Sequence, residues 1–200
     1  SLQGSGRRQI LLTPISITYD LWQRAKAGEQ AAFDELFSIH TEKLLVFTRA
    51  RLGERLRARI EPQDVLQEAY AAAWQSFSKF DYVDDGAFVR WMCRIIDNRL
   101  RDANDFFNAA RRQVQELPQA APTGPVTALA RAENCERVQT ALAQLSDEHR
   151  EVILLRYFQG LSAEEAGERM QRSAGAIRNL LSRALVELGK RLKPDEESKS

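Results

Sequence analysis

Basic and amide side chains gather near the end of this 200-residue chain, in a stretch patterned as two helices. Ser162 and Glu165 form a capping box that starts the first helix, and Ser173 starts the second. Apolar residues recur at helical spacing from 177 to 188. The other face carries groups that can read base edges, namely Arg178, Asn179, Ser182 and Arg183. A short helix, a turn and a longer basic helix form the helix-turn-helix plan, whose second helix enters the major groove of DNA.

The residues that could perform covalent chemistry or bind a metal do not have the sequence spacing that these tasks require. Cys93 and Cys135 lie far apart without metal-ligand spacing, and His40 and His149 have no His, Glu or Cys at ligand spacing. The sequence also lacks a nucleophile–base pair and a phosphate-binding glycine loop. We therefore expect no enzymatic activity, no metal and no cofactor, and two reduced thiols in a reducing compartment.

Charge is distributed unevenly, although the net charge is only +1. Residues 169–193 hold seven basic side chains against one acid, and residues 90–112 hold six arginines against three aspartates. A phosphate backbone responds to such local patches rather than to the total charge. No apolar run reaches the roughly 18 residues of a membrane-spanning helix, and the first six residues have no signal-peptide core.

The elements that would position these groups are helices. Few prolines, few glycines and many Leu, Ala, Arg, Glu and Gln residues predict an all-α protein. We expect a break at Gly28 within helical residues 19–50, a helix over 63–77 that starts after Glu61 and Pro62, and a helix over 87–109. Further helices are expected over 128–145 and from Ser146 to Gly160.

A proline-rich segment, residues 113–127, divides the chain. It predicts a flexible linker that limited proteolysis would cut, between a helical bundle at 19–112 and a helix-turn-helix domain at 128–193. With such a linker, the two small domains should vary in relative orientation.

Three motifs in this order resemble bacterial sigma factors of the sigma-70 family, extracytoplasmic-function type. Residues 64–70, DVLQEAY, match the pattern D-x-x-Q-E-x-[FY]. Residues 88–112 match F-x-x-W-[LM]-x-x-I-x-x-N-x-x-x-D, and the helix-turn-helix matches LS-x-x-E-x-A followed by S-x-x-A-[IV]-[RK]-x-L-x-x-R-A. The resemblance covers residues 21–192.

The resemblance implies a factor that binds core RNA polymerase, recognises the −10 and −35 elements of a promoter and helps to open the DNA. Its expected partners are promoter DNA and the polymerase, through the clamp coiled coil of the β′ subunit and through the β subunit. An anti-sigma factor is a further candidate partner. No membrane partner is expected, and the expected location is the cytoplasm.

The same resemblance assigns residues to each task. Polymerase binding falls to Asp64, Leu66, Gln67 and Glu68, whose polar members share one helix face. Recognition of the −10 element involves Asn98, which helps to hold a flipped base, and a loop over 80–86 that would close over that base. The −10 set is Phe80, Tyr82, Arg94, Asn98, Arg99 and Arg101. The −35 set is Arg172, Ser173, Arg178, Asn179, Ser182 and Arg183.

Two other classes stay open from the residues alone. A stand-alone helix-turn-helix regulator would use the C-terminal half but would have no use for the Asp64–Tyr70 helix or the Asn98 segment. An interaction protein would have its helices held by an anti-sigma partner. Core-polymerase pull-down separates the first alternative from a sigma factor, and run-off transcription with core enzyme alone separates the second.

Overall fold

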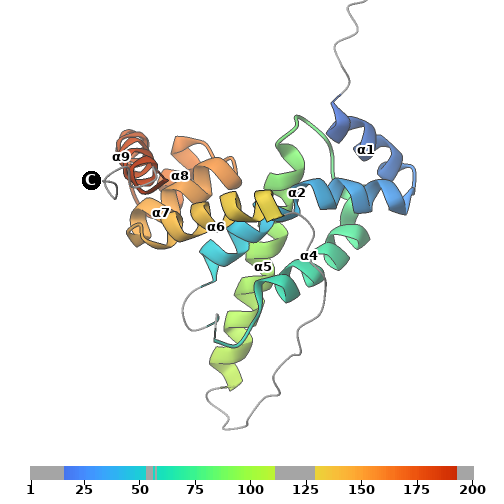
Figure 1. Ribbon diagram of the computed structural model, residues 1–200, viewed down its shortest axis with the longest axis horizontal. Helices are drawn as coiled ribbons and strands as arrows, with labels where there is room; N and C mark the ends of the chain where they lie inside the picture. The colour runs from blue at the N-terminus through green and yellow to red at the C-terminus, as the bar shows by residue number, and fades with distance from the viewer. Residues whose placement is uncertain (1–15, 53–55, 57, 111–128, 193–200) are drawn as a thin grey trace, which may run out of the picture.

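The computed structural model describes residues 16–52, 56, 58–110 and 129–192, and all regular structure in these ranges is helical (Figure 1). The all-α prediction is therefore confirmed. The segment predicted as a flexible linker, 113–127, lies outside the described residues, so that expectation and its domain boundaries stay predictions. No helix in the described ranges is long and apolar enough to cross a membrane.

The N-terminal half is a helical bundle that packs around the ring of Phe33. Gly28, with φ +95°, makes the predicted turn between α1 and α2, and Pro62 begins α4 at the expected place. Phe33 is fully buried, and its ring contacts Tyr70, Trp74 and Phe77. The elements are α1 (Ile17–Lys26), α2 (Gln30–Arg51), α4 (Pro62–Ser76), η1 (Phe77–Lys79) and α5 (Ala87–Ala110).

The C-terminal half depends on caps that the sequence predicts. Ser146 accepts a hydrogen bond from the His149 backbone N–H, and the helix it starts continues as a π-helical turn. Gly160, with φ +65°, follows that turn and ends the segment as expected. The elements are α6 (Leu129–Ala143), α7 (Asp147–Ile153), η2 (Leu154–Phe158), α8 (Ala163–Met170) and α9 (Ala174–Leu192).

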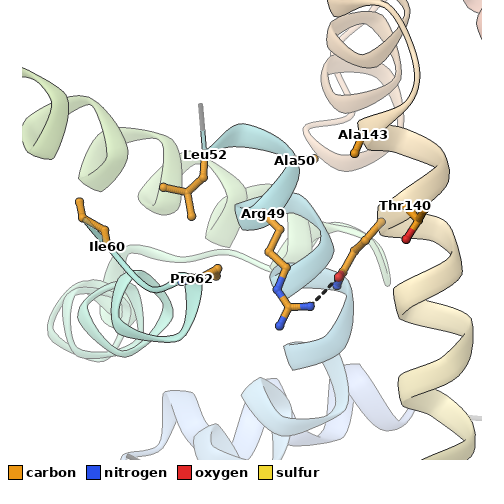
Figure 2. A pocket seen from close by; sticks show the side chains of 8 residues that line it. Arg49, Ala50, Leu52, Ile60, Pro62, Thr140 and Ala143 are labelled. Carbon is orange, nitrogen blue, oxygen red and sulfur yellow. Dashed lines mark hydrogen bonds between the residues drawn. The ribbon is translucent and has the colours of Figure 1, made fainter. Parts of the chain in front are cut away.

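The two halves pack together rather than standing apart. In Figure 1 the yellow α6 lies beside α2, and the buried side chains of both halves form one continuous core. Phe47 of α2 meets Phe158 of η2 with ring centroids 5.6 Å apart. A hollow of about 350 Å³ opens between α6 and the end of α2, where Arg49 donates a hydrogen bond to Gln139 (Figure 2).

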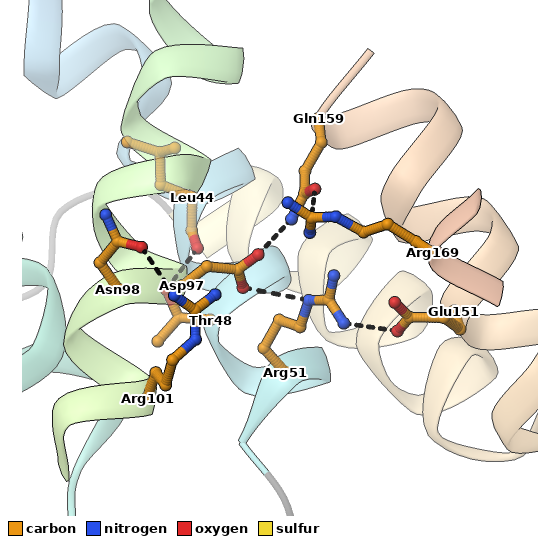
Figure 3. A network of polar contacts seen from close by, with 9 residues as sticks. All are labelled: Leu44, Thr48, Arg51, Asp97, Asn98, Arg101, Glu151, Gln159 and Arg169. Atoms are coloured by element: carbon orange, nitrogen blue, oxygen red, sulfur yellow. Dashed lines mark hydrogen bonds and ion pairs between the residues drawn. The ribbon is translucent and has the colours of Figure 1, made fainter. Parts of the chain in front are cut away.

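A polar network crosses the same boundary (Figure 3). Arg51 of α2 pairs with Asp97 of α5, Nε to Oδ1 3.2 Å, and with Glu151 of α7. Gln159 donates to Asp97 and accepts from Arg169 at 3.4 Å. Burial raises the pKa of Asp97, while the charge of Arg51 acts in the opposite direction. These contacts give the halves one packed arrangement in this structure, and their expected separability stays a prediction.

Candidate nucleic-acid interface

The start of α8 and the turn from α8 into α9 are fixed by residues close together in the chain. Ser162 accepts from the Glu165 backbone N–H at 3.1 Å, and Glu165 accepts from the Ser162 N–H at 2.7 Å, which confirms the predicted capping box. Gln171 ends α8 in the left-handed region with φ 54°. A Cβ on Gly167 would lie only 2.5 Å from the carbonyl oxygen of Arg172, so this close crossing needs glycine.

One face of α9 is buried and the other is open, as the sequence predicts. Ile177 is fully buried against the rest of the C-terminal half. The exposed face carries the four predicted base-reading residues, Arg178, Asn179, Ser182 and Arg183. Ser173 caps α9 by accepting from the Ala176 N–H at 3.2 Å. Basic and amide groups therefore lie together on one convex helix face, which suits a DNA groove.

Two arginines of this surface contact carboxylates from neighbouring helices. Arg178 lies 3.4 Å from Glu164, and both side chains remain about two-thirds exposed, at 63% and 67%. Arg172 pairs with Glu148 at the start of α7. Exposed pairs of this kind contribute little stability, so both arginines can exchange their carboxylates for nucleic-acid groups at low cost.

The helix α5 presents a second basic and amide stripe. Arg94, Asn98 and Arg101 are spaced four and three residues apart, lie on one face and are exposed. Arg101 donates to the side-chain oxygen of Asn98 at 3.3 Å (Figure 3). This contact orients the amide of Asn98 at the surface. The structure thus brings three members of the predicted −10 set together.

Arg99 faces a different direction from that stripe. It lines a hollow of about 630 Å³ with the polar face of α4, formed by Asp64, Gln67 and Glu68. Asp102, Ala103 and Phe106 of α5 and Arg59 and Ile60 before α4 also line it. Leu66, expected at the same surface, is only 4% exposed and packs in the core. Its expected direct role is corrected, because the apolar side chain points to the opposite side of α4.

Residues 80–86 form the predicted loop, between η1 and α5. Phe80 is 4% exposed, and its ring stacks on Trp91 with centroids 4.8 Å apart. The expectation that Phe80 touches DNA is therefore corrected, since its ring belongs to the core. Tyr82 is half-buried, and Val83 at the tip is 74% exposed.

Sequence reasoning missed the part that α1 plays at this loop. Tyr19, Trp22 and Lys26 recur at helical spacing, and that pattern is visible in the sequence. The pattern alone indicates only a helix face, because the loop that covers it is more than 50 positions away in the chain. The Arg51 network was missed for the same reason.

The described residues include both cysteines but no cluster of candidate metal ligands. No group of three His, Cys, Asp or Glu residues there could hold a metal ion. Cys93 and Cys135 are free thiols, and burial raises the pKa of Cys93 well above its ordinary value. A buried, protonated thiol is unreactive, so Cys93 serves as a packing residue.

Comparisons with known proteins match both halves. Residues 41–112 match the family model Sigma-70 region 2, and residues 141–190 match Sigma-70, region 4. The RNA polymerase sigma factor CnrH of Cupriavidus metallidurans is 30% identical over 185 residues, which cover 87% of this chain and 93% of that protein. The sigma factor NccH of Alcaligenes xylosoxydans xylosoxydans is 29% identical over 184 residues, which cover 88% and 95%.

Further relatives come from other bacteria and from solved structures. The extracytoplasmic-function sigma factor SigW of Bacillus subtilis is 26% identical over 182 residues, which cover 86% of this chain and 94% of that protein. A solved structure of CnrH in complex with the cytosolic domain of CnrY matches at 27% identity and a TM-score of 0.47. That match covers 88% of this chain and 97% of the solved one.

Proposed function

Since the chain belongs to the extracytoplasmic-function group of the sigma-70 family, we propose that its two halves divide promoter recognition between them. The chain is a promoter-recognising sigma factor that acts in transcription initiation. The N-terminal half docks on core RNA polymerase and holds the −10 element. The C-terminal half reads the −35 element through α9.

The observation that carries the assignment within the N-terminal half is the pair of faces on α5. Asn98 and Arg99 are adjacent, so their side chains point about 100° apart around the helix. Asn98 lies with Arg94 and Arg101 on an open stripe, whereas Arg99 faces the hollow beside Asp64 and Glu68. Polymerase and DNA can therefore occupy separate faces of one helix at the same time.

The hollow is the proposed polymerase-docking surface. Its α4 wall is polar and exposed at Gln67 and Glu68, and Arg99 adds a cation from α5. A coiled coil presents charged side chains along its flanks, and a mixed polar groove can pair with them. We therefore assign Arg99 to the polymerase side rather than to the −10 element.

The open stripe on α5 is the proposed −10 surface. Opening DNA requires unstacked bases to be held outside the duplex, and amides beside a basic groove supply that chemistry. Asn98 holds a base of the displaced strand, while Arg94 and Arg101 contact phosphates, which fix position without reading sequence. Tyr82, in the loop that precedes α5, provides an aromatic ring for stacking.

The convex face of α9 is the proposed −35 surface. Arg178 can bind guanine O6 and N7, and Asn179 can read adenine, while Ser182 and Arg183 extend the same face. Arg172 and the backbone amides at the Ser173 helix start face phosphates. We propose that Arg178 supplies sequence discrimination and that Arg172 supplies general affinity.

The partners follow from these surfaces. We propose core RNA polymerase and promoter DNA as the working partners, no covalent chemistry and no cofactor, with the cytoplasm as the place of action. An anti-sigma factor is a further proposed partner. Relatives support this: CnrH was solved in complex with the cytosolic domain of CnrY, and BldN with RsbN.

Charge reversal on the docking surface tests the function. Glu68→Lys should lower the amount of core polymerase that co-purifies with the full chain by about tenfold or more, because a cation replaces an anion at the centre of the contact. Glu136→Lys, an equal reversal on exposed α6, is the control and should leave co-purification unchanged. Equal co-purification of parent and Glu68→Lys, with unchanged circular dichroism, would contradict the assignment.

A further inference from the structure

The start of the loop at residues 80–86 is held against α1 through the backbone carbonyl group of Phe80. Trp22 donates its indole N–H to that oxygen at 3.4 Å, and Lys26 donates its ammonium at 2.8 Å. Lys26 also forms an ion pair with Asp81 at 3.2 Å and lies 5.7 Å from the centroid of the Trp22 ring. One side of α1 therefore fixes the point where the chain leaves η1.

The middle of the loop rests on the same helix. The ring of Tyr82 meets Tyr19 edge-on with centroids 5.1 Å apart and lies 5.9 Å from Trp22. Tyr19 and Trp22 in turn contact each other at 5.5 Å. Aromatic contacts of this geometry add stabilising free energy to that gained by burying the rings. Contacts with α1 therefore fix the position of Tyr82, the aromatic side chain of the loop that reaches toward solvent.

The three loop carboxylates all have donors from the protein. Asp81 pairs with Lys26, and Asp84 pairs with Arg90 at 2.7 Å. Asp85 accepts from the hydroxyls of Ser16 and Tyr82. These donors lower the pKa of Asp84 and of Asp85. An acidic loop would repel a DNA strand, and the charges of Lys26 and Arg90 offset part of that repulsion, while the side chains of Asp81 and Asp84 stay 83% and 56% exposed.

We propose that α1 is the positioning helix of the −10 base-reading loop, with Trp22 and Lys26 as positioning residues that set base selection without touching DNA. The inference rests on the proposed function of the −10 surface. A loop that must fit over one unstacked base loses selectivity when it moves, because a displacement of about 1 Å misaligns its contacts. Two donors on one carbonyl and an aromatic seat under Tyr82 restrict that movement.

Matched variants separate positioning from general folding. Lys26→Met removes both donations to the loop, and Trp22→Phe keeps an aromatic ring but loses the indole N–H. Lys26→Arg restores a cation and should rescue. Tyr19→Phe is the control, because it keeps the ring beneath Tyr82 and loses only the hydroxyl that accepts from Gln23 within α1.

The readout is base preference in the assembled holoenzyme. Parent and variant chains, each bound to core polymerase, select from a single-stranded DNA pool with a randomised central hexamer, and the bound strands are sequenced. Enrichment of the preferred base should fall about tenfold in Lys26→Met and Trp22→Phe, the size of one lost base contact. Binding to core polymerase should stay at the parental level. Duplex binding through the basic residues of α9 should stay at the parental level too.

Hydrogen exchange of the loop amides in the free chain supplies a second readout that needs neither DNA nor polymerase. Exchange over 80–86 should accelerate in Lys26→Met and not in Tyr19→Phe. Faster exchange with an unchanged base preference would overturn the inference and leave the proposed function intact. A parent holoenzyme that shows no base preference would remove the proposed −10 function itself, and the inference with it.

Discussion

The two DNA-facing surfaces of this protein are held in place in different ways. The −35 surface on α9 depends on neighbours in the chain, with a capping box between Ser162 and Glu165 and a close approach of Gly167 to Arg172. The −10 surface depends on partners far away, since the loop carbonyl of Phe80 accepts from residues 54 and 58 positions earlier. One surface is therefore encoded locally, and the other exists only once the N-terminal bundle has folded.

The largest expected effect breaks the local surface alone. Gly167→Ala places a Cβ 2.5 Å from a backbone oxygen that cannot move without opening the turn. We expect it to destabilise the C-terminal half by about 3 kcal/mol, as overpacking does, and to abolish −35 binding. Denaturant unfolding followed by hydrogen exchange would localise the loss to residues 129–192.

A second glycine supplies the matched control. A Cβ on Gly175 in α9 meets nothing within 4 Å. Gly175→Ala should therefore leave stability unchanged or raise it by about 0.5–1 kcal/mol, because alanine has the higher helix propensity. Equal losses in the two variants would show that the Gly167 crossing has no special role.

The next effect sharpens the comparison within the −35 surface. Arg178→Ala should cost about 1–3 kcal/mol of discrimination between the preferred −35 sequence and a changed one, because a base contact is lost. Arg172→Ala should weaken binding to both sequences alike and flatten the salt dependence, since a phosphate contact carries no sequence information. Duplex titrations with holoenzyme at several salt concentrations measure both. Identical behaviour of the two variants would contradict the assigned roles.

The smallest expected effect is a loss of stability of the N-terminal bundle as the pH falls. Burial lowers the pKa of His40 below its ordinary value of 6.5, and Lys43 lowers it further, against the opposing charge of Asp85. Below pH 6.5 the unfolded chain binds this proton before the folded chain does, so the free energy of unfolding should decrease as the pH falls. Denaturant unfolding between pH 7.5 and about 5.5 would measure it.

Two histidine variants show which half of the protein causes that pH dependence. His40→Gln should remove the decrease, because the buried ring next to Phe88 is then no longer protonated on unfolding. His149→Gln, in the C-terminal half, should leave the His40 contribution in place. A parental slope in His40→Gln would show that another group causes the decrease.

The features that could be predicted from the sequence are the local ones, and the features that could not are the long-range ones. The helices, the Gly28 turn, the Ser162 capping box and the exposed face of α9 depend on local spacing, and all were predicted correctly. Phe80 and Leu66 were assigned to surfaces, but the structure buries both. Their burial results from Trp91 and from the bundle core, partners that no local pattern identifies. The anchoring of the loop by α1 and the Arg51 network were missed for that reason.

The contacts between the two halves are a second feature that the sequence did not predict. Arg51 and Asp97 are largely buried, with side chains 17% and 15% exposed, and they connect α2 and α5 to α7 and to Gln159, the residue that follows η2. A linker's composition predicts its flexibility but contains no information about surfaces that can meet across it. The packed arrangement follows from complementary groups on four separate elements.

Asn98 provides the most direct test of the central claim, that opening the −10 element and reading the −35 element belong to separate halves. The full chain with Asn98→Ala, bound to core polymerase, is compared with the parent by permanganate footprinting of the −10 region and by −35 duplex binding. We expect −35 binding to be kept and permanganate-reactive thymines in the −10 region to be largely lost. If the variant opens promoters as well as the parent does, Asn98 is a structural amide and the proposed division of labour is wrong at that site.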